Sequence, residues 1–221
     1  MRIRTALGVA LAATVLSFTA APASAADEAR DNERSCGELR LTGSLPAPPA
    51  GMAVQQKVSI GPDCAPRLGE VRLVPLDGAK GAAGAAAASG PHRLSSWNEM
   101  YDCCNIRMTG LYTTSEWTSE GGRVVRATTE ATQQWNREPW DAGWSLKSAT
   151  EDADCATDCP VSRNEAHAAF SYRGIFDATG DWYANTHHSY VDLGADGAAT
   201  CRFDVELRHS FIGWNWRRGC A

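Results

Sequence analysis

The chain has 221 residues, of which 43% are hydrophobic and 21% are charged. This length is enough for one sizeable domain or for two small domains. Its 26 acidic residues outnumber 21 lysines and arginines, so the formal net charge is −5. An acidic chain repels phosphate backbones and anionic lipid, so we expect neither nucleic acid nor a membrane surface as partner. Few lysines beside many arginines, alanines and glycines suggest a GC-rich bacterial genome.

The first 25 residues are predicted to be a cleavable secretory signal. Arg2 and Arg4 precede an apolar run over 6–21, and Ala23-Ser24-Ala25 supplies the small residues that signal peptidase accepts. The run is shorter than the roughly 20 residues that span a bilayer, so we expect cleavage rather than a membrane anchor. Cleavage removes two arginines and no acid, leaving 19 basic against 26 acidic residues and a formal charge of −7. We therefore expect a secreted, extracellular protein that is not an integral membrane protein.

All eight cysteines follow this signal, and an even number in an exported protein favours full pairing. Cys36 with Cys64 and Cys201 with Cys220 each bracket one compact strand-like run. Cys155 with Cys159 closes a short loop. These three disulfide bonds leave Cys103 and Cys104 for each other.

A bond between Cys103 and Cys104 is strained. Their Cα atoms lie about 3.8 Å apart across a trans peptide, whereas a relaxed disulfide needs at least about 4.4 Å. If the two residues are on a strand, their side chains point to opposite faces. The alternative pairing then joins them, in either order, to Cys155 and Cys159. Paired Cys-x-x-Cys spacing is absent, so we expect no zinc site and no cofactor.

Composition divides the remaining chain into four parts. A charged tail over 26–35 precedes a small β-segment over 36–76, where apolar residues alternate with polar ones. An Ala/Gly-rich linker follows over 77–91, because its side chains bury too little apolar surface to offset the entropy of ordering it. The larger part, 92–221, is predicted to be a β-rich C-terminal domain. The first β-segment either forms its own domain or adds strands to the second.

Alternation indicates an all-β fold, an antiparallel, disulfide-stabilised β-sandwich. The clearest strand runs from Cys201 to Phe211, with apolar residues and His209 on one side and charged residues on the other. The stretch 162–170 could begin a helix with a Ser cap and Glu165, but its alternating apolar residues favour a strand.

Two polar patterns carry possible chemistry. His187 and His188 are adjacent on a predicted strand, so their rings face opposite sides and cannot share a metal. The following hairpin turn places His187 near Glu206 and His188 near Val205, which predicts a cross-strand His–Glu contact. The acidic loop 151–158 could hold calcium, but it lacks the glycine of a sharp calcium-binding turn, so we interpret it as solvated.

Eight tryptophans are the strongest functional signal. Such a number is difficult to bury in a thin sandwich, so we expect at least one exposed cluster. Flat indole faces beside polar groups suit sugars and also protein hot spots. The candidate ligand-binding residues are Trp140, Trp144, Trp182, Trp214, Asn215 and Trp216.

These observations favour a secreted, non-catalytic binding protein that presents tryptophans to glycan or cell-wall material. The alternative is a protein-binding module, either a protease inhibitor or a subunit of a secreted assembly, which uses the Cys155–Cys159 loop and an exposed Arg217-Arg218 pair. The third hypothesis is a secreted hydrolase. The sequence contains no nucleophile elbow, zincin motif or phosphate-binding glycine loop, so no catalytic residue is assigned.

Overall fold

The structure, a computed structural model, describes residues 35–76, 90–136, 143–172 and 183–221. All regular secondary structure in these ranges is β-strand, so the all-β prediction is confirmed. The strands are β1 Ser35–Leu45, β2 Met52–Ile60, β3 Pro66–Leu68, β4 Arg72–Pro75, β5 Gly90–Tyr101, β6 Arg107–Glu120, β7 Arg123–Trp135, β8 Trp144–Ala153, β9 Val161–Tyr172, β10 Tyr183–Gly194, β11 Ala199–Phe211 and β12 Asn215–Cys220. None of the described residues forms a helix long and apolar enough to cross a membrane.

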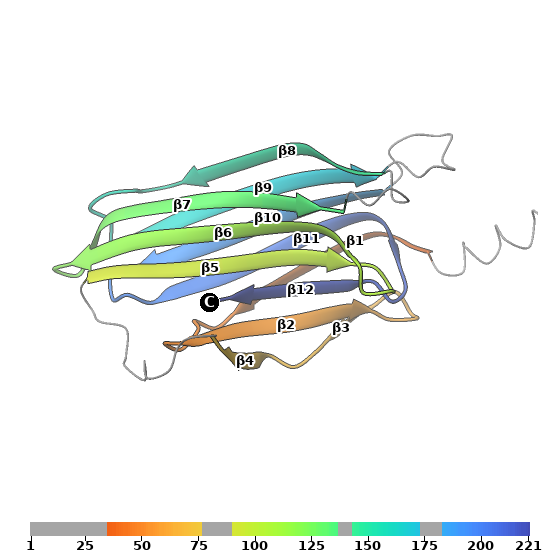
Figure 1. The fold of residues 1–221 in the computed structure, drawn as a ribbon, viewed down its shortest axis with the longest axis horizontal. Coiled ribbons are helices and arrows are strands. Elements are labelled where there is room, and N and C mark those ends of the chain that lie inside the picture. The colour runs from red at the N-terminus through yellow and green to blue at the C-terminus, as the bar shows by residue number, and fades with distance from the viewer. Residues whose placement is uncertain (1–34, 77–89, 137–142, 173–182) are drawn as a thin grey trace, which may run out of the picture. The chain divides into compact units, whose positions relative to one another are not determined.

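The strands form two antiparallel sheets that pack face to face (Figure 1). Sheet A has the order β1-β11-β10-β9-β8, and sheet B has the order β3-β2-β12-β5-β6-β7, with β4 also paired to β2. The inward side chains of both sheets share one hydrophobic core. The sandwich prediction therefore holds.

The predicted N-terminal β-segment belongs to this same sandwich. Strand β1 pairs with β11 in sheet A, while β2 pairs with β12 in sheet B. The chain thus crosses between the sheets within the segment 36–76. Most of the predicted linker, 77–89, lies outside the described residues, and its last two residues, Gly90 and Pro91, begin β5.

Strand β11 shows how alternation builds the core. Cys201, Phe203, Val205 and Leu207 are all buried, as predicted. The pattern breaks near the strand end, where His209 has a φ of +57° and Ser210 is the buried residue. The register against β1 shifts at the same place, which is a β-bulge. The extra residue therefore removes His209 from the apolar row in which alternation placed it.

Three disulfide bonds match the predicted pairs. Cys36–Cys64, Cys155–Cys159 and Cys201–Cys220 have Cα–Cα distances of 5.3, 6.2 and 6.7 Å. The last pair joins β11 to β12 and so links the two sheets. Cys103 and Cys104 are exposed free thiols with Sγ atoms 3.8 Å apart, so the expectation that all eight cysteines pair is wrong. Neither the bond between these two residues nor the alternative pairing with Cys155 and Cys159 is present. Three disulfide bonds indicate an oxidising environment, as found outside the cytosol.

Candidate binding groove

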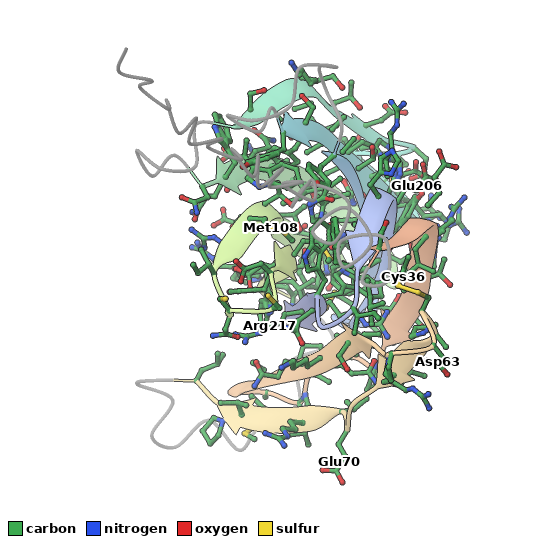
Figure 2. The ribbon with its side chains drawn as sticks, turned by 90° about the vertical axis from the view of Figure 1, so that its right-hand side faces the viewer. Cys36, Asp63, Glu70, Met108, Glu206 and Arg217 are labelled. Atoms are coloured by element: carbon green, nitrogen blue, oxygen red, sulfur yellow. A yellow bond between two sulfur atoms is a disulfide. The ribbon has the colours of Figure 1, made fainter. Side chains whose placement is uncertain are left out.

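A groove of about 650 Å³ lies on the solvent-facing side of sheet B. Outward-facing residues of three neighbouring strands line it, together with the edge segment 67–72. Figure 2 labels Glu70, on this edge, and Arg217, on β12. The outward-facing lining residues of β2, β5 and β12 are Gln55, Lys57, Ser59, Trp97, Glu99 and Arg217, and Gln56 and Arg218 of β2 and β12 also line the groove.

Strand parity places these side chains on one face. On β5 the buried residues Ser96, Asn98 and Met100 point into the sandwich. Trp97 and Glu99 lie between them and therefore point outward. Antiparallel pairing then sets Trp97 opposite Gly219 and Glu99 opposite Arg217 of β12. The lining is thus fixed by the sheet and not by a loop.

Trp97 lies flat against the backbone of Gly219. A Cβ built on Gly219 would come within 1.9 Å of the indole, so no larger residue fits beneath the ring. Gly219 is buried under this ring, while Trp97 itself is only half-buried. One indole face therefore packs on the sheet, and the residue also lines the groove.

A carboxylate beside Trp97 is held by two tyrosines and an arginine. The Tyr112 hydroxyl donates to Glu99 Oε1 at 2.5 Å, and the Tyr101 hydroxyl donates to Oε2 at 3.1 Å. Arg107 Nη1 lies 3.5 Å from Glu99 Oε1 and donates to the Tyr112 hydroxyl at 2.7 Å. The Glu99 side chain is only 12% exposed. This network fixes the carboxylate in one orientation.

The two phenols remain neutral donors. Burial, followed by the adjacent Glu99, raises the pKa of Tyr112. Burial raises the pKa of Tyr101 as well, and the charge of Glu99 and its hydrogen bond raise it further. Arg217 covers the cluster, with its guanidinium carbon 4.1 Å from the centre of the Tyr101 ring. Its guanidinium also donates to Asn105 Oδ1.

The groove thus joins an aromatic surface to charged groups and to neutral polar ones. Trp97 offers an apolar face, Glu99 and Arg217 offer an oriented acceptor and donor, and Gln55 and Ser59 offer neutral hydrogen-bonding groups. Such a lining can hold a polyhydroxylated ligand against the ring while its hydroxyls are bonded at the sides.

The predicted ligand-binding residues that the structure describes lie elsewhere and are not exposed. Trp144, Trp214, Asn215 and Trp216 are 7%, 8%, 7% and 1% exposed. Trp216 points between the sheets, where its Nε1 donates to Asn98 Oδ1 at 2.7 Å. The expectation of an exposed Trp214–Trp216 surface is therefore wrong, because sheet A covers this face of β12. Trp140 and Trp182 lie outside the described residues.

Other aromatic rings pack around these indoles. The Trp214 ring centroid lies 5.3 Å from that of Phe211 and 6.4 Å from that of Tyr183. The Trp144 and Tyr172 centroids are 5.6 Å apart. Asn215 Nδ2 donates to the carbonyls of Gly213 and Asp102, which fixes the chain at the start of β12. These contacts give the four residues a structural role.

His187 belongs to a polar layer inside the sandwich. The register between β10 and β11 differs by one residue from the predicted register. His187 therefore lies opposite Val205, and His188 lies opposite Asp204. His187 Nδ1 donates to Asn98 Oδ1 at 3.0 Å, and its Nε2 lies 2.8 Å from Thr109 Oγ1. Burial, and secondarily His188, lowers the pKa of His187 to about 3, so the ring is neutral.

The predicted His–Glu contact is made by the neighbouring residue on the outer face of sheet A. His188 Nε2 lies 3.9 Å from Glu206 Oε1. Its Nδ1 lies 2.6 Å from Nδ1 of His167, its cross-strand neighbour. Within the described residues, no three His, Cys, Asp or Glu side chains gather into a metal-binding group.

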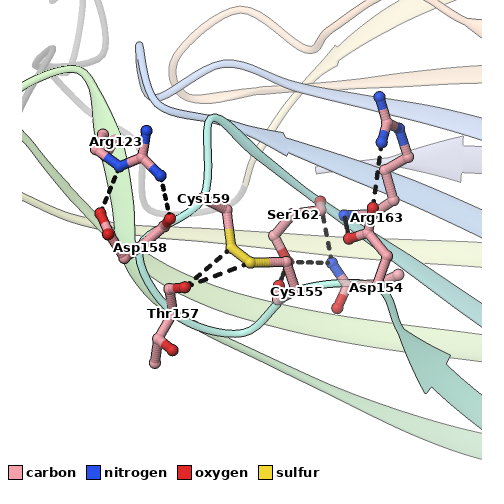
Figure 3. Close-up of a disulfide and its surroundings, with 9 residues drawn as sticks. Arg123, Asp154, Cys155, Thr157, Asp158, Cys159, Ser162 and Arg163 are labelled. Carbon is pink, nitrogen blue, oxygen red and sulfur yellow. Dashed lines mark hydrogen bonds and ion pairs between the residues drawn. A yellow bond between two sulfur atoms is a disulfide. The ribbon is translucent and has the colours of Figure 1, made fainter.

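The acidic loop is tied down by basic partners (Figure 3). Arg123 bonds both the carboxylate and the carbonyl of Asp158, and the Asp154 carboxylate accepts from Arg163 N and Nη1 at 2.8 and 3.1 Å. Ser162 donates to the Cys155 carbonyl at 2.5 Å. The loop bounded by Cys155 and Cys159 is therefore held in one conformation.

Arg218 was expected to be exposed beside Arg217, and this expectation is wrong. It is 3% exposed, and its guanidinium carbon lies 4.3 Å from the Trp216 ring centre. Its Nη2 donates to Gln56 Oε1 at 2.5 Å. Burial lowers the pKa of Arg218 to about 10. Gly43 of β1 makes room for this side chain, since a Cβ there would meet Nη1 at 1.9 Å.

Sequence reasoning missed Trp97 as a candidate. Alternation over 96–101 shows that Trp97, Glu99 and Tyr101 share a face, but not that this face is the outer one. The clue is Gly219 within a strand, a residue that marks the close approach of another group. Comparisons with protein-family models, curated proteins and solved structures find no match to this chain.

Proposed function

We propose that this is a secreted, non-catalytic binding protein whose groove on sheet B holds a glycan of a cell wall or of the surroundings. The observation that carries the proposal is Trp97, which lies flat over Gly219 on a solvent-facing sheet and borders the groove. An indole in this position adds little to the core, yet it is held firmly in place. Rigid placement lowers the entropy that ligand binding costs.

The neighbouring groups match the chemistry of sugars. Sugar rings carry apolar C–H faces that pack on indoles, and their hydroxyls both donate and accept hydrogen bonds. Glu99 is an oriented acceptor, and Arg217 is a nearby cation that rests on Tyr101. The groove crosses the sheet from the edge segment 67–72 over β2 and β12 to β5.

This proposal keeps the predicted class of function and changes the residues that perform it. The binding aromatic is Trp97, while Trp144, Trp214 and Trp216 support the fold. Trp140 and Trp182 stay predictions. Secretion is supported by the three disulfide bonds together with the signal-like N-terminus.

The test is depletion of the purified, oxidised protein by insoluble chitin, cellulose and bacterial cell wall. We expect saturable depletion by one of these polymers, which free oligosaccharide competes away, and its loss in Trp97→Ala. The matched control is Tyr190→Ala, which removes a half-buried aromatic from the outer face of sheet A, where Arg202 stacks on it at 3.5 Å. Equal depletion of Trp97→Ala and wild type would refute this site.

A second candidate function is protein binding through the loop bounded by Cys155 and Cys159. The supporting observation is its rigidity, because backbone pairing of Val124 with Cys159 adds to the disulfide and the Arg123–Asp158 ion pair. A rigid exposed loop suits a protease inhibitor. A panel of serine and metalloproteases tests this function, and undiminished activity of every protease at stoichiometric concentration would reject it.

A further inference from the structure

The turn between β5 and β6 presents two neighbouring thiols to solvent. Cys103 and Cys104 are both exposed, and their Sγ atoms lie 3.8 Å apart. The other six cysteines are in disulfide bonds. Within the described residues, this pair therefore supplies the free thiols.

The turn is rigid, so the two sulfur atoms are held in place. Asp102 N donates to the Ile106 carbonyl at 3.0 Å, and Ile106 N donates to Asp102 Oδ1 at 2.8 Å. Asn105 has a φ of +66° and accepts a hydrogen bond from Arg217. A Cβ on Gly213 would lie 3.3 Å from the Cys103 Cβ, so the neighbouring loop packs against the turn.

Backbone geometry opposes a bond between these two thiols. Their peptide bond is trans, which holds the Cα atoms about 3.8 Å apart, and relaxed disulfides need at least about 4.4 Å. The turn nevertheless brings both sulfur atoms to the same side. The arrangement therefore favours two separate sulfur ligands.

The sulfur separation fits a shared metal ion. Two thiolates bound at about 2.3 Å to one tetrahedral ion lie about 3.8 Å from each other. We propose that Cys103 and Cys104 form a two-thiolate chelate for a thiophilic divalent metal ion of the Zn²⁺ and Cd²⁺ class. Each thiol loses one proton on binding, so one ion replaces two protons, and two coordination positions remain for solvent or an external ligand.

This chelate differs from a structural zinc site. In the described residues no third His, Cys, Asp or Glu joins the pair, so the ion is exchangeable and the fold does not depend on it. Thiolate ligands select soft ions over Mg²⁺ and Ca²⁺. Because metal binding releases both thiol protons, binding strengthens as the pH rises.

The test is an anaerobic titration of the gently reduced, folded protein with Cd²⁺, followed by ultraviolet sulfur-to-cadmium charge transfer. We expect saturation at one Cd²⁺ per chain, with loss of the signal in Cys103→Ser and in Cys104→Ser. As a control, His167→Ala removes one member of the His167–His188 pair, which is also a close pair of potential metal ligands. This variant should bind Cd²⁺ as wild type does. Excess Mg²⁺ should not compete.

Three results would overturn the proposal. These are no charge transfer with two titratable thiols present, an unchanged signal in either cysteine variant, or a Cys103–Cys104 disulfide that survives gentle reduction. Thiol alkylation with mass spectrometry counts the free thiols in each sample. The site does not depend on glycan binding, so Trp97→Ala should bind Cd²⁺ normally.

Discussion

Replacing Gly219 by alanine tests the proposed groove without touching any group that would bind the ligand. The new Cβ would lie 1.9 Å from the Trp97 ring. Carbon atoms pack best at about 3.5–4.0 Å, so the indole must move by about 2 Å. Binding geometry tolerates only about 0.5 Å of displacement, so the stacking surface is lost.

The expected effect on binding follows from the free energy that one aromatic stacking contact contributes. An aromatic contact contributes about 0.5–1.5 kcal/mol beyond the area that it buries, and 1.4 kcal/mol corresponds to about tenfold in affinity. We therefore expect Gly219→Ala to weaken polysaccharide depletion by about tenfold. Alanine suits a strand better than glycine by about 0.5–1 kcal/mol, which offsets part of the steric cost. Stability should thus stay within about 1 kcal/mol of wild type, or about 2–4 °C in Tm.

The assay compares depletion isotherms and thermal melts of wild type, Gly219→Ala and Trp97→Ala. Full binding by Gly219→Ala, with Trp97→Ala inactive, would show that the flat indole position is not needed. Unfolding of Gly219→Ala would instead show that the contact between Trp97 and Gly219 supports the fold. Either result would contradict the proposal that the contact between Trp97 and Gly219 serves ligand binding and is not needed for folding.

Two further predictions concern stability. Because burial depresses the pKa of His187 to about 3, the unfolded chain binds the extra proton between about pH 6.5 and 3. Stability is therefore full above pH 6.5 and falls below it, by about 2 kcal/mol from pH 7 to 5; urea unfolding should show this loss in wild type, and an equal loss in His187→Leu would contradict the assignment. Opening Cys201–Cys220 by paired alanine substitutions should cost about 3 kcal/mol, against about 2 kcal/mol for the shorter Cys155–Cys159 loop. Equal Tm values for the two double variants would show that loop entropy does not set their difference.

The fold was accessible from sequence because its signals are local. Alternation from Cys201 to Leu207 identifies a strand with one buried face, and turn residues mark where strands end. The disulfide pairs follow from the compact runs that they bracket. Each of these features depends on neighbours in the chain or on a short loop.

Register and facing were less accessible, because they depend on turn geometry and on the other sheet. The β10–β11 turn begins after Leu193, which pairs with Ala199, so His187 lies opposite Val205 and not Glu206. A slip of one residue moves a side chain to the other face of the sheet. Because of this difference in register, His187 is fully buried and does not make the predicted surface contact with Glu206.

The two tryptophans Trp97 and Trp216 show how strand parity separates a core residue from a residue on the outer face. Both lie on adjacent strands of sheet B, but parity directs Trp216 toward sheet A and Trp97 toward solvent. A glycine inside a central strand costs about 0.5–1 kcal/mol, because it loses more backbone freedom than alanine on folding. At Gly219 this cost is not offset by better packing of the core. The missing side chain instead lets the Trp97 indole lie flat on the outer face. The free side of this ring is where the proposed glycan would pack.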